Sequence, residues 1–175
     1  MMLSSGHSLS AQELNASDGA AGDFFGGFGG SVSLSGNTAL IGAILDDDNG
    51  SQSGSAYMFR NLGTATGTIN ESIKLLPSDG AAGDFFGRVS LSGNTALIGA
   101  ILDDDNGSSS GSAYLFRNLG TATGTINESV KLLPSDGAAG DFFGRVSLSG
   151  NTALIGAILD DDNGCLLYTS PSPRD

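Results

Sequence analysis

Three identical acidic runs are the residues of this chain most suited to chemistry. The stretch ILDDDNG occurs at residues 44–50, 101–107 and 158–164, and each copy places three carboxylates side by side. Carboxylates and backbone carbonyls are the oxygen ligands that Ca²⁺ prefers, but Asp, Asn and Gly are also the residues that form tight turns. Each run is therefore either a metal-binding loop or the polar tip of a hairpin.

The spacing within the run fits a calcium loop poorly. A loop of the D-x-[DN]-x-[DN]-G type takes oxygen ligands at its first, third and fifth positions and a glycine at its sixth. When Gly107 is placed sixth, Asp104 and Asn106 fall at the third and fifth positions. Leu102 then falls first and offers no side-chain oxygen, and Ala113 stands twelfth, where an EF-hand has its bidentate acid. We therefore expect solvated hairpin tips.

A weak calcium site is the alternative. Its candidate ligands, with neighbouring carbonyls, are Asp46, Asp48, Asp103 and Asp105. Such a site should bind Ca²⁺ with a dissociation constant on the order of 10⁻⁴ to 10⁻³ M, as extracellular modules do. We expect no other cofactor.

Residues for catalysis are scarce. His7 is the only histidine and Cys165 the only cysteine, so this chain does not supply the side chains of a catalytic triad or a zinc site. Asp103 and Asp105 could form a carboxylate pair like that of a glycosidase, but acids at hairpin tips are mostly solvated turn residues. We therefore expect a protein that is not an enzyme.

The negative charge is confined to repeated loops. The net charge is −12 at pH 7, and of the 19 acidic residues nine lie in the DDD runs and six in three SDGAAGD segments. Such a surface repels phosphate backbones, which argues against nucleic acid as a partner. No apolar run approaches the roughly 18 residues of a membrane span, and no signal peptide is visible.

An internal repeat organises the chain. A shift of 57 residues places residues 32–107 on residues 89–164 with three differences. These are Gln52 against Ser109, Met58 against Leu115 and Ile73 against Val130. Two of them exchange one apolar residue for another, which indicates buried positions. The first copy has four additional residues, in GGFGGSVS where later copies read GRVS. A repeat of this length predicts stacked units of supersecondary structure.

Each repeat predicts four short strands. In the second copy they are residues 87–91, 95–102, 112–117 and 128–133, separated by loops rich in Gly, Asn, Ser and Thr. The segment TALIGAIL is almost continuously apolar, as in a strand covered on both faces, and Gly99 within it indicates close approach of another backbone. Four antiparallel strands per repeat describe a propeller blade between neighbouring blades.

Two motifs carry a resemblance to a known family. FG at Phe86 and Gly87, followed by TALIGAI at residues 95–101, resembles the FG-GAP repeat of integrin α-subunit propellers, and more closely the FG-GAP repeat proteins of bacteria and algae. The resemblance covers residues 11–164, although Ile101 stands where the motif name has Pro. It implies an all-β fold, an incomplete open propeller built of four-stranded antiparallel blades. In integrin-like blades the calcium loop lies between FG and GAP, an interval without acids here.

The resemblance also predicts the organisation of the chain. The expected segments are the last strand of a preceding blade (1–17), a first repeat (18–76), a second repeat (77–133), a partial third repeat (134–164) and a tail (165–175). The tail, CLLYTSPSPRD, matches nothing earlier. It is the translation of a DNA sequence that resembles the end adapter of a transposase-prepared sequencing library. We therefore expect adapter read-through without a packing partner, and a chain that is a fragment of a longer protein.

Two functions are compatible with these features. The resemblance implies a non-enzymatic module, extracellular or on the cell surface, that binds a protein or glycan ligand or mediates adhesion through the loops of the propeller. The alternative is a propeller segment that accompanies a catalytic domain, such as a hydrolase, whose active residues lie outside these 175.

Overall fold

The computed structural model describes residues 12–27, 29, 31–63 and 67–160 and the backbone of residues 165–169. These residues form β-strands and no helix, so none of them forms a helix long and apolar enough to cross a membrane. The strands are β1 (Glu13–Asn15), β2 (Val32–Ser35), β3 (Thr38–Ala43), β4 (Ser55–Phe59), β5 (Thr68–Asn70), β6 (Ile73–Leu75), β7 (Phe86–Ser92), β8 (Thr95–Ala100), β9 (Ser112–Phe116), β10 (Gly124–Ile126), β11 (Val130–Leu132), β12 (Phe143–Ser149), β13 (Thr152–Ala157) and β14 (Cys165–Thr169).

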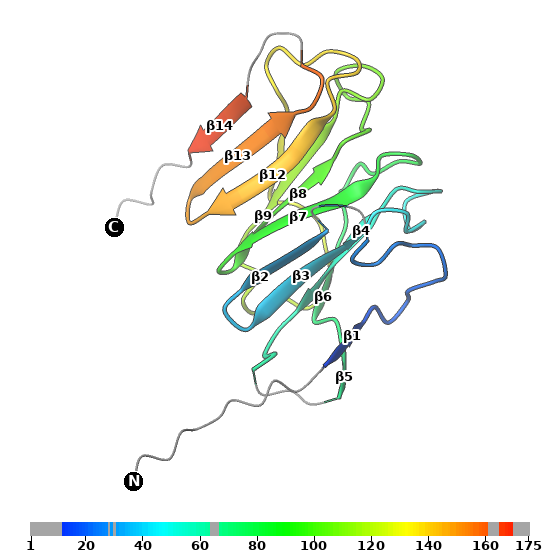
Figure 1. Cartoon of the computed structure of the whole chain (residues 1–175), viewed down its shortest axis with the longest axis vertical. Coiled ribbons are helices and arrows are strands. Elements are labelled where there is room, and N and C mark those ends of the chain that lie inside the picture. The colour runs from blue at the N-terminus through cyan, green and yellow to red at the C-terminus, as the bar shows by residue number, and fades with distance from the viewer. Residues whose placement is uncertain (1–11, 28, 30, 64–66, 161–164, 170–175) are drawn as a thin grey trace.

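The strands build three successive blades, which follow one another along the long axis of the molecule (Figure 1). Blade 1 consists of β2, β3, β4 and β6, blade 2 of β7, β8, β9 and β11, and blade 3 of β12, β13 and β14. Neighbouring strands within each blade are antiparallel. None of the described sheets closes on itself. The predicted fold, an open all-β propeller fragment with four-stranded antiparallel blades, is confirmed for blades 1 and 2.

Two short strands were missed in segments predicted as loops. In the segment NLGTATGTIN, β10 pairs in parallel with β6, the fourth strand of the preceding blade. In the first repeat, β5 pairs in parallel with β1 in the same way. Each strand is three residues long, too short for an alternating pattern to be recognised, and it forms through backbone pairing with a distant segment. Parallel pairing therefore links blade 2 to the last strand of blade 1, and β1 occupies the same last-strand position for blade 1.

The central strands are buried on both faces, as predicted. In β8, Leu97 packs in a cluster with Ile155 of blade 3, whereas Ile98 packs in a cluster with Leu40 of blade 1. Leu97 and Ile98 are both fully buried, although their side chains point to opposite faces of the sheet. The nearly continuous apolar run of TALIGAIL thus reflects two neighbouring blades, one against each face.

Close backbone contact between blades explains the glycine of TALIGA. A Cβ atom on Gly99 would lie 1.9 Å from the carbonyl oxygen of Gly144, and one on Gly42 would lie 1.9 Å from that of Gly87. Gly87 and Gly144 have φ angles of 145° and 134°, which residues with a side chain rarely adopt. The predicted close approach at Gly99 is confirmed, and its partner is the glycine that follows the two phenylalanines of the next repeat.

The first strands of successive blades are joined by serine hydroxyls. The N–H groups of Leu91 and Gly93 in and after β7 donate to Ser33 Oγ and Ser35 Oγ of β2, both at 3.0 Å. The same bonds recur one blade further on, from Leu148 and Gly150 to Ser90 Oγ and Ser92 Oγ, at 2.9 Å. The polar positions of the VSLS motif therefore hold neighbouring blades together.

The tail departs from its prediction. Residues 165–169 form β14, which pairs antiparallel with β13 and extends blade 3. The expectation that the tail lacks a packing partner is therefore wrong for this segment, and residues 170–175 lie outside the described part. An open strand edge such as that of β13 offers unpaired N–H and C=O groups to any extended segment. Because this pairing uses the backbone, it does not depend on the origin of the segment, and adapter read-through stays a prediction.

Candidate functional site

The first acid of each of the first two DDDNG runs is an interior residue. Asp103 follows β8, and its side chain is almost completely buried, as is that of Asp46 in the first repeat. Asp103 Oδ1 accepts a hydrogen bond from Ser112 Oγ at 2.8 Å, and Oδ2 accepts one from Tyr114 Oη at 2.7 Å. The prediction of a solvated tip is therefore wrong for this acid, because hydroxyl groups on β9 compensate for the water that it loses.

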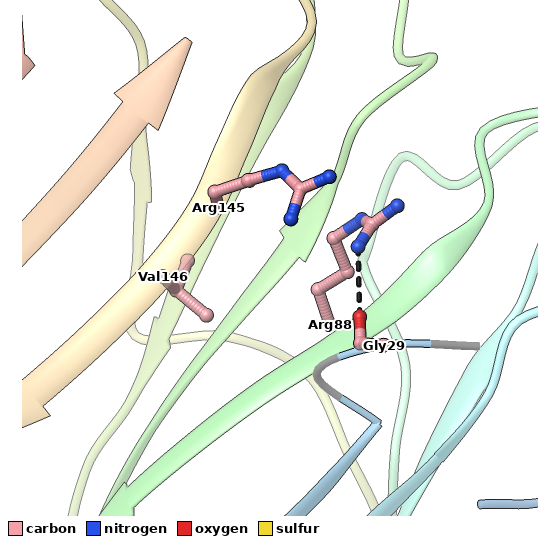
Figure 2. Close-up of a pocket in the computed structure, with 4 residues that line it drawn as sticks. All are labelled: Gly29, Arg88, Arg145 and Val146. Carbon is pink, nitrogen blue, oxygen red and sulfur yellow. Dashed lines mark hydrogen bonds between the residues drawn. The ribbon is translucent and has the colours of Figure 1, made fainter. Parts of the chain in front are cut away.

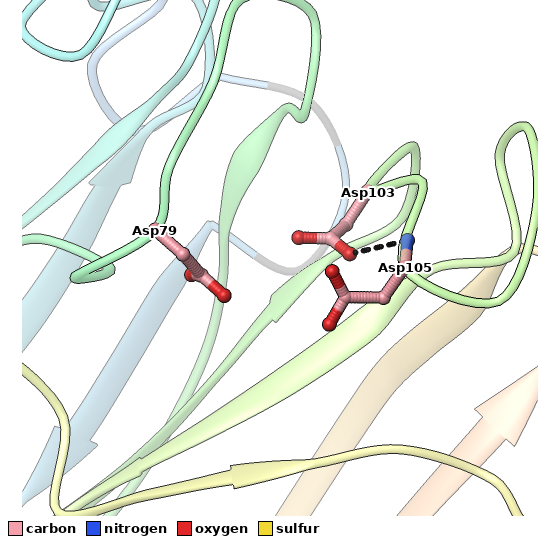
Figure 3. A group of neighbouring side chains, drawn as sticks. All are labelled: Asp79, Asp103 and Asp105. Atoms are coloured by element: carbon pink, nitrogen blue, oxygen red, sulfur yellow. Dashed lines mark hydrogen bonds between the residues drawn. The ribbon is translucent and has the colours of Figure 1, made fainter.

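A lysine lies at the centre of a cluster of three carboxylates. Asp79, on the loop between β6 and β7, faces Asp103 and Asp105 on the loop between β8 and β9 (Figure 3). Lys131 of β11 places its Nζ 2.6 Å from Asp79 Oδ2, 3.2 Å from Asp103 Oδ2 and 2.6 Å from Asp105 Oδ2. The side chain of Lys131 is 16% exposed. One ammonium thus joins two loops and the last strand of blade 2.

The first repeat contains the same cluster. Lys74 of β6 places its Nζ 2.6 Å from Asp18 Oδ2 and 3.7 Å from Asp46 Oδ2, and it also forms an ion pair with Asp48. Tyr57 Oη lies 2.8 Å from Asp46 Oδ2, as the hydroxyl of the equivalent tyrosine of blade 2 lies beside Asp103. Because both repeats share the arrangement, it is a property of the repeat.

The electrostatics of the cluster favour the charged forms of Asp103 and Lys131. Burial alone would lower the pKa of Lys131, but hydrogen bonds to Asp105 and Asp79 outweigh it and raise the pKa. Burial alone would raise the pKa of Asp103, yet hydrogen bonds from Tyr114 and Ser112 and the charge of Lys131 lower it. Burial and the neighbouring Asp103 raise the pKa of Tyr114, so its hydroxyl stays a donor.

The same carboxylates are close enough together to hold a metal ion. One oxygen from each of Asp79, Asp103 and Asp105 lies within 4.8 Å of the other two. Ca²⁺, however, takes six to eight oxygen ligands at about 2.3–2.6 Å. The Lys131 ammonium already contacts all three acids and would repel a divalent cation from the same place. The residues present therefore do not fit calcium as long as the lysine stays in position.

The sequence alone identified part of this site. It pointed to Asp46, Asp48, Asp103 and Asp105, which the structure divides between the two clusters, one pair in each. It missed Asp18 and Asp79 from the SDGAAGD segments and the lysines Lys74 and Lys131. The signal that could have found them is that SD and ESxK recur along the chain together with the DDDNG run.

The serine and glutamate of these two motifs form a second contact. Ser78 donates from Oγ to Glu128 Oε1 at 2.6 Å and from its backbone N–H to Glu128 Oε2 at 2.9 Å. Glu71 accepts the equivalent pair of bonds from Ser17. The ESxK segments at the ends of blades 1 and 2 therefore each hold the SD dipeptide of the loop that leads into the same blade, with Glu on the serine and Lys on the aspartate.

A groove elsewhere on the molecule carries positive charge. It has a volume of about 400 Å³ and is lined by Gly29, Arg88, Arg145 and Val146 (Figure 2). Arg88 Nη1 donates to the carbonyl oxygen of Gly29 at 2.8 Å, and the guanidinium of Arg145 extends toward that of Arg88. Burial and the charge of Arg145 lower the pKa of Arg88. The groove thus lies between β7 and β12, the first strands of blades 2 and 3, beside the segment that precedes β2.

Comparison with known proteins agrees with the repeat structure. No curated protein sequence matches the chain. The model of the FG-GAP repeat matches three times, at residues 10–59, 69–116 and 126–166. These matches cover most of the sequence and include the TALIGA motifs whose glycines meet the next blade. The resemblance seen in the sequence is therefore confirmed, and the chain belongs to the FG-GAP repeat family.

Proposed function

We propose that this chain is a non-enzymatic binding or adhesion module that works outside the cell or on its surface, through the loops at one edge of its blades. The observation that carries the proposal is that the DDDNG loops and the SDGAAGD loops are hydrogen-bonded to one another and form one acidic surface, which we call the rim. The DDDNG loops and the SDGAAGD loops together contain 15 of the 19 acidic residues. A surface of one charge sign attracts partners of the other sign.

Hydrogen bonds hold the two kinds of loop together. Asn49 Nδ2 donates to the carbonyl oxygen of Pro77 at 3.1 Å, and the N–H of Gly83 donates to that of Ser51 at 2.9 Å. Asn106 forms the equivalent bond to the carbonyl oxygen of the proline one repeat further on, at 3.2 Å. The β3–β4 and β6–β7 loops lie together on one side of the molecule (Figure 1). The rim is therefore a fixed surface built from repeated loops.

Part of the rim remains available to a partner. Asp47 and Asp104, the middle acids of the first two runs, are exposed. Their Oδ1 atoms accept backbone hydrogen bonds from Gln52 and Ser109, both at 2.7 Å, which fixes the position of each carboxylate. Pre-positioned charges of this kind favour a protein surface rich in Lys and Arg, because charge complementarity speeds association and sets orientation.

The state of the remaining acids supports a role without catalysis. A carboxylic acid that donates a proton at neutral pH needs a raised pKa. The pKa of Asp103 is lowered, and Asp79 and Asp105 each lie 2.6 Å from the Lys131 ammonium. These acids stabilise the blade, and we propose that they do not perform acid–base chemistry. We also propose that the Lys131 ammonium neutralises these three acids, which is the role that a Ca²⁺ ion has in a calcium-binding loop.

A binding experiment with a cationic probe tests the proposal. We expect the full chain to bind a fluorescent deca-lysine peptide at low salt, with an affinity that falls as salt is added. The double substitution Asp47→Asn and Asp104→Asn should weaken binding several-fold. The matched control, Glu13→Gln with Asp175→Asn, removes two charges from outside the DDDNG and SDGAAGD segments and should leave the affinity unchanged. Equal losses in both variants, or no binding by the full chain, would refute a binding rim.

A second experiment tests the absence of catalysis. The full chain is incubated with chromogenic glycoside and phosphodiester substrates, and product formation is compared with that of an Asp103→Asn variant. We expect no turnover in either case. Turnover by the full chain that the Asp103→Asn substitution abolishes would overturn the non-enzymatic assignment.

A further inference from the structure

We propose that the groove between β7 and β12 binds a phosphate group with two negative charges, held by the guanidinium groups of Arg88 and Arg145. The groove lies between blades 2 and 3, outside the two lysine–carboxylate clusters. The proposal does not depend on the binding function of the acidic rim. It rests on the position, the charge and the hydrogen-bond donors of two arginines that neighbouring blades bring together (Figure 2).

The structure brings these two arginines together without an acid between them. Of the seven Lys and Arg residues, Lys74 and Lys131 lie within clusters of carboxylates. Arg60 donates to three backbone carbonyls of the next blade. Within the described part of the chain, the ion pairs involve neither Arg88 nor Arg145. The groove therefore keeps its positive charge in a molecule whose net charge is −12.

The local structure of both strands directs the two side chains to this place. In β7 the pairing with β8 shifts between Phe86 and Arg88, and in β12 the pairing with β13 shifts between Phe143 and Arg145. A bulge of this kind bends the strand and changes the direction of a side chain next to it. Both bulges contain the glycine of the FG motif. The placement of the arginines is thus a property of the repeat.

A neutral acceptor fixes the orientation of one guanidinium. Arg88 Nη1 donates to the carbonyl oxygen of Gly29 at 2.8 Å, which orients the group without cancelling its charge. A guanidinium has five N–H donors. The remaining donors of Arg88, and those of Arg145, form no hydrogen bond with another described residue. Their planar fork matches two oxygens of a phosphate group.

The two positive charges act on each other. The guanidinium of Arg145 extends toward that of Arg88 (Figure 2). Burial and the charge of Arg145 lower the pKa of Arg88, which means that its charged form is disfavoured where it stands. A ligand with two negative charges would neutralise both guanidiniums, whereas a ligand with one charge would leave the repulsion in part.

The dimensions of the groove admit more than a bare ion. Its volume of about 400 Å³ lies within the range of about 300–1,000 Å³ for small-molecule sites. Val146 adds an apolar side chain beside the two arginines. The ligand is therefore either free phosphate or a small molecule that carries phosphate as a monoester. A nucleic-acid backbone fits less well, because each of its phosphates has one charge and the acidic molecule repels a polyanion.

A second role for the arginines needs to be separated from this one. Charged side chains on edge strands discourage pairing with other chains. β7 and β12 are both edge strands of their sheets, so each arginine could protect its own edge. That role requires a charge on each strand, but it does not require the two guanidiniums to approach each other. Their convergence is the observation that indicates a shared ligand.

NMR of the arginine side chains tests the site in the full chain. Inorganic phosphate is titrated at about pH 7.5, where a phosphate group carries close to two negative charges, and chloride keeps the ionic strength constant. We expect the ¹³Cζ signals of Arg88 and Arg145 to shift and to saturate with one shared dissociation constant in the millimolar range. The signals of Arg60 and of the exposed Arg117 are internal controls and should not saturate.

A pair of matched variants shows which arginine the binding needs. Arg145→Gln should weaken phosphate binding by at least about tenfold, because a hydrogen bond to a charged group contributes on that scale. Arg117→Gln removes the same charge from an exposed position outside the groove and should leave the affinity unchanged. Without phosphate, Arg145→Gln should not lower the melting temperature, since it removes a like charge from beside Arg88. This readout separates a lost ligand contact from damage to the fold.

Two further titrations identify the source of the phosphate group. Glucose 6-phosphate that binds more tightly than inorganic phosphate would indicate a monoester ligand, and equal affinities would indicate the free ion. Acetate, which has one charge, should bind more weakly than either. The proposal is wrong if phosphate shifts all four arginine signals alike, if Arg88 and Arg145 do not respond, or if Arg145→Gln and Arg117→Gln weaken binding equally. Self-association of Arg145→Gln with unchanged phosphate binding would show that the arginine only protects a strand edge.

Discussion

Lys131 Nζ lies 2.6 Å from Asp79 Oδ2, although the two residues are 52 positions apart in the sequence. Lys131 belongs to the last strand of blade 2, and Asp79 to the loop that enters this blade. The ion pair therefore fastens the beginning of a repeat to its end. Because Lys131 also contacts Asp103 and Asp105, the acidic run that suggested a metal site is part of this fastening.

Removing the lysine should destabilise the chain. Lys131→Met leaves the buried Asp103 carboxylate without its cation, and loss of one partner of a buried pair costs about 3 kcal/mol or more. We expect a loss of this size in the free energy of unfolding, measured by urea denaturation. Arg117→Met removes one positive charge from an exposed residue and should change the free energy by less than about 0.5 kcal/mol. Equal effects of the two substitutions would show that Lys131 has no special role.

The same substitution should create a calcium response. Without the ammonium, Asp79, Asp103 and Asp105 have mutual distances that suit a single cation. We expect millimolar Ca²⁺ to raise the melting temperature of Lys131→Met by more than that of the unmodified chain, since a ligand that binds only the folded state stabilises it. Mg²⁺ at the same concentration is the control. Micromolar calcium affinity of the unmodified chain, lost on replacing Asp103 and Asp105 by Asn, would instead show a true calcium site.

We expect the free energy of unfolding to be greatest between about pH 4 and pH 10, because the pKa shifts of Asp103 and Lys131 define this window. The pKa of Asp103 is lowered in the folded state, so its contribution is present above the unfolded value of about 3.9 and disappears as pH falls through the folded pKa. The pKa of Lys131 is raised, so its contribution is complete below the unfolded value of about 10.4 and disappears as pH rises through the folded pKa. Asp84 acts in the opposite sense, because burial raises its pKa and its ionised form weakens the fold.

Urea denaturation as a function of pH measures these contributions. Asp103→Asn should flatten the loss of stability on the acid side, and Lys131→Met should flatten the loss on the alkaline side. A Glu13→Gln control changes an exposed acid and should leave both sides unchanged. If the free energy of unfolding changed with pH in the same way in the unmodified chain and in all three variants, the roles given to Asp103 and Lys131 would be wrong.

The features that the sequence predicted are local ones. The strands β7, β8, β9 and β11 overlap their predicted ranges because each is marked by an apolar pattern and bounded by turn residues. The close approach at Gly99 was predictable because a glycine weakens the interior of a strand and is typical of places where another backbone comes near. By contrast, the ion pair of Lys131 with Asp79 joins segments far apart in the chain, and no local pattern shows that these two segments meet.

The features that were missed depend on contacts between distant segments. β10 is defined by pairing with β6, and the burial of Asp103 is defined by hydroxyl groups on β9. From the sequence alone, all three acids of a DDD run are expected to be exposed to solvent, because burying a charge without a partner is costly. The pairing of β14 with β13 was also missed, since the backbone of an open edge accepts segments that share no pattern with the repeat.

The glycine contact between blades gives a test of the stacked arrangement. A methyl group at position 99 would lie 1.9 Å from the Gly144 carbonyl, so Gly99→Ala requires blade 3 to move away from blade 2. Overpacking of this kind typically costs about 1–3 kcal/mol and occasionally more. We expect Gly99→Ala to lower the free energy of unfolding by an amount at the upper end of this range, measured by urea denaturation. Gly29→Ala is the matched control, because a Cβ there meets no atom within 4 Å. It should change stability by less than about 1 kcal/mol. If the two alanines had the same small effect, blades 2 and 3 would not be in backbone contact at this position, and the stacking of FG-GAP blades described for this chain would need revision.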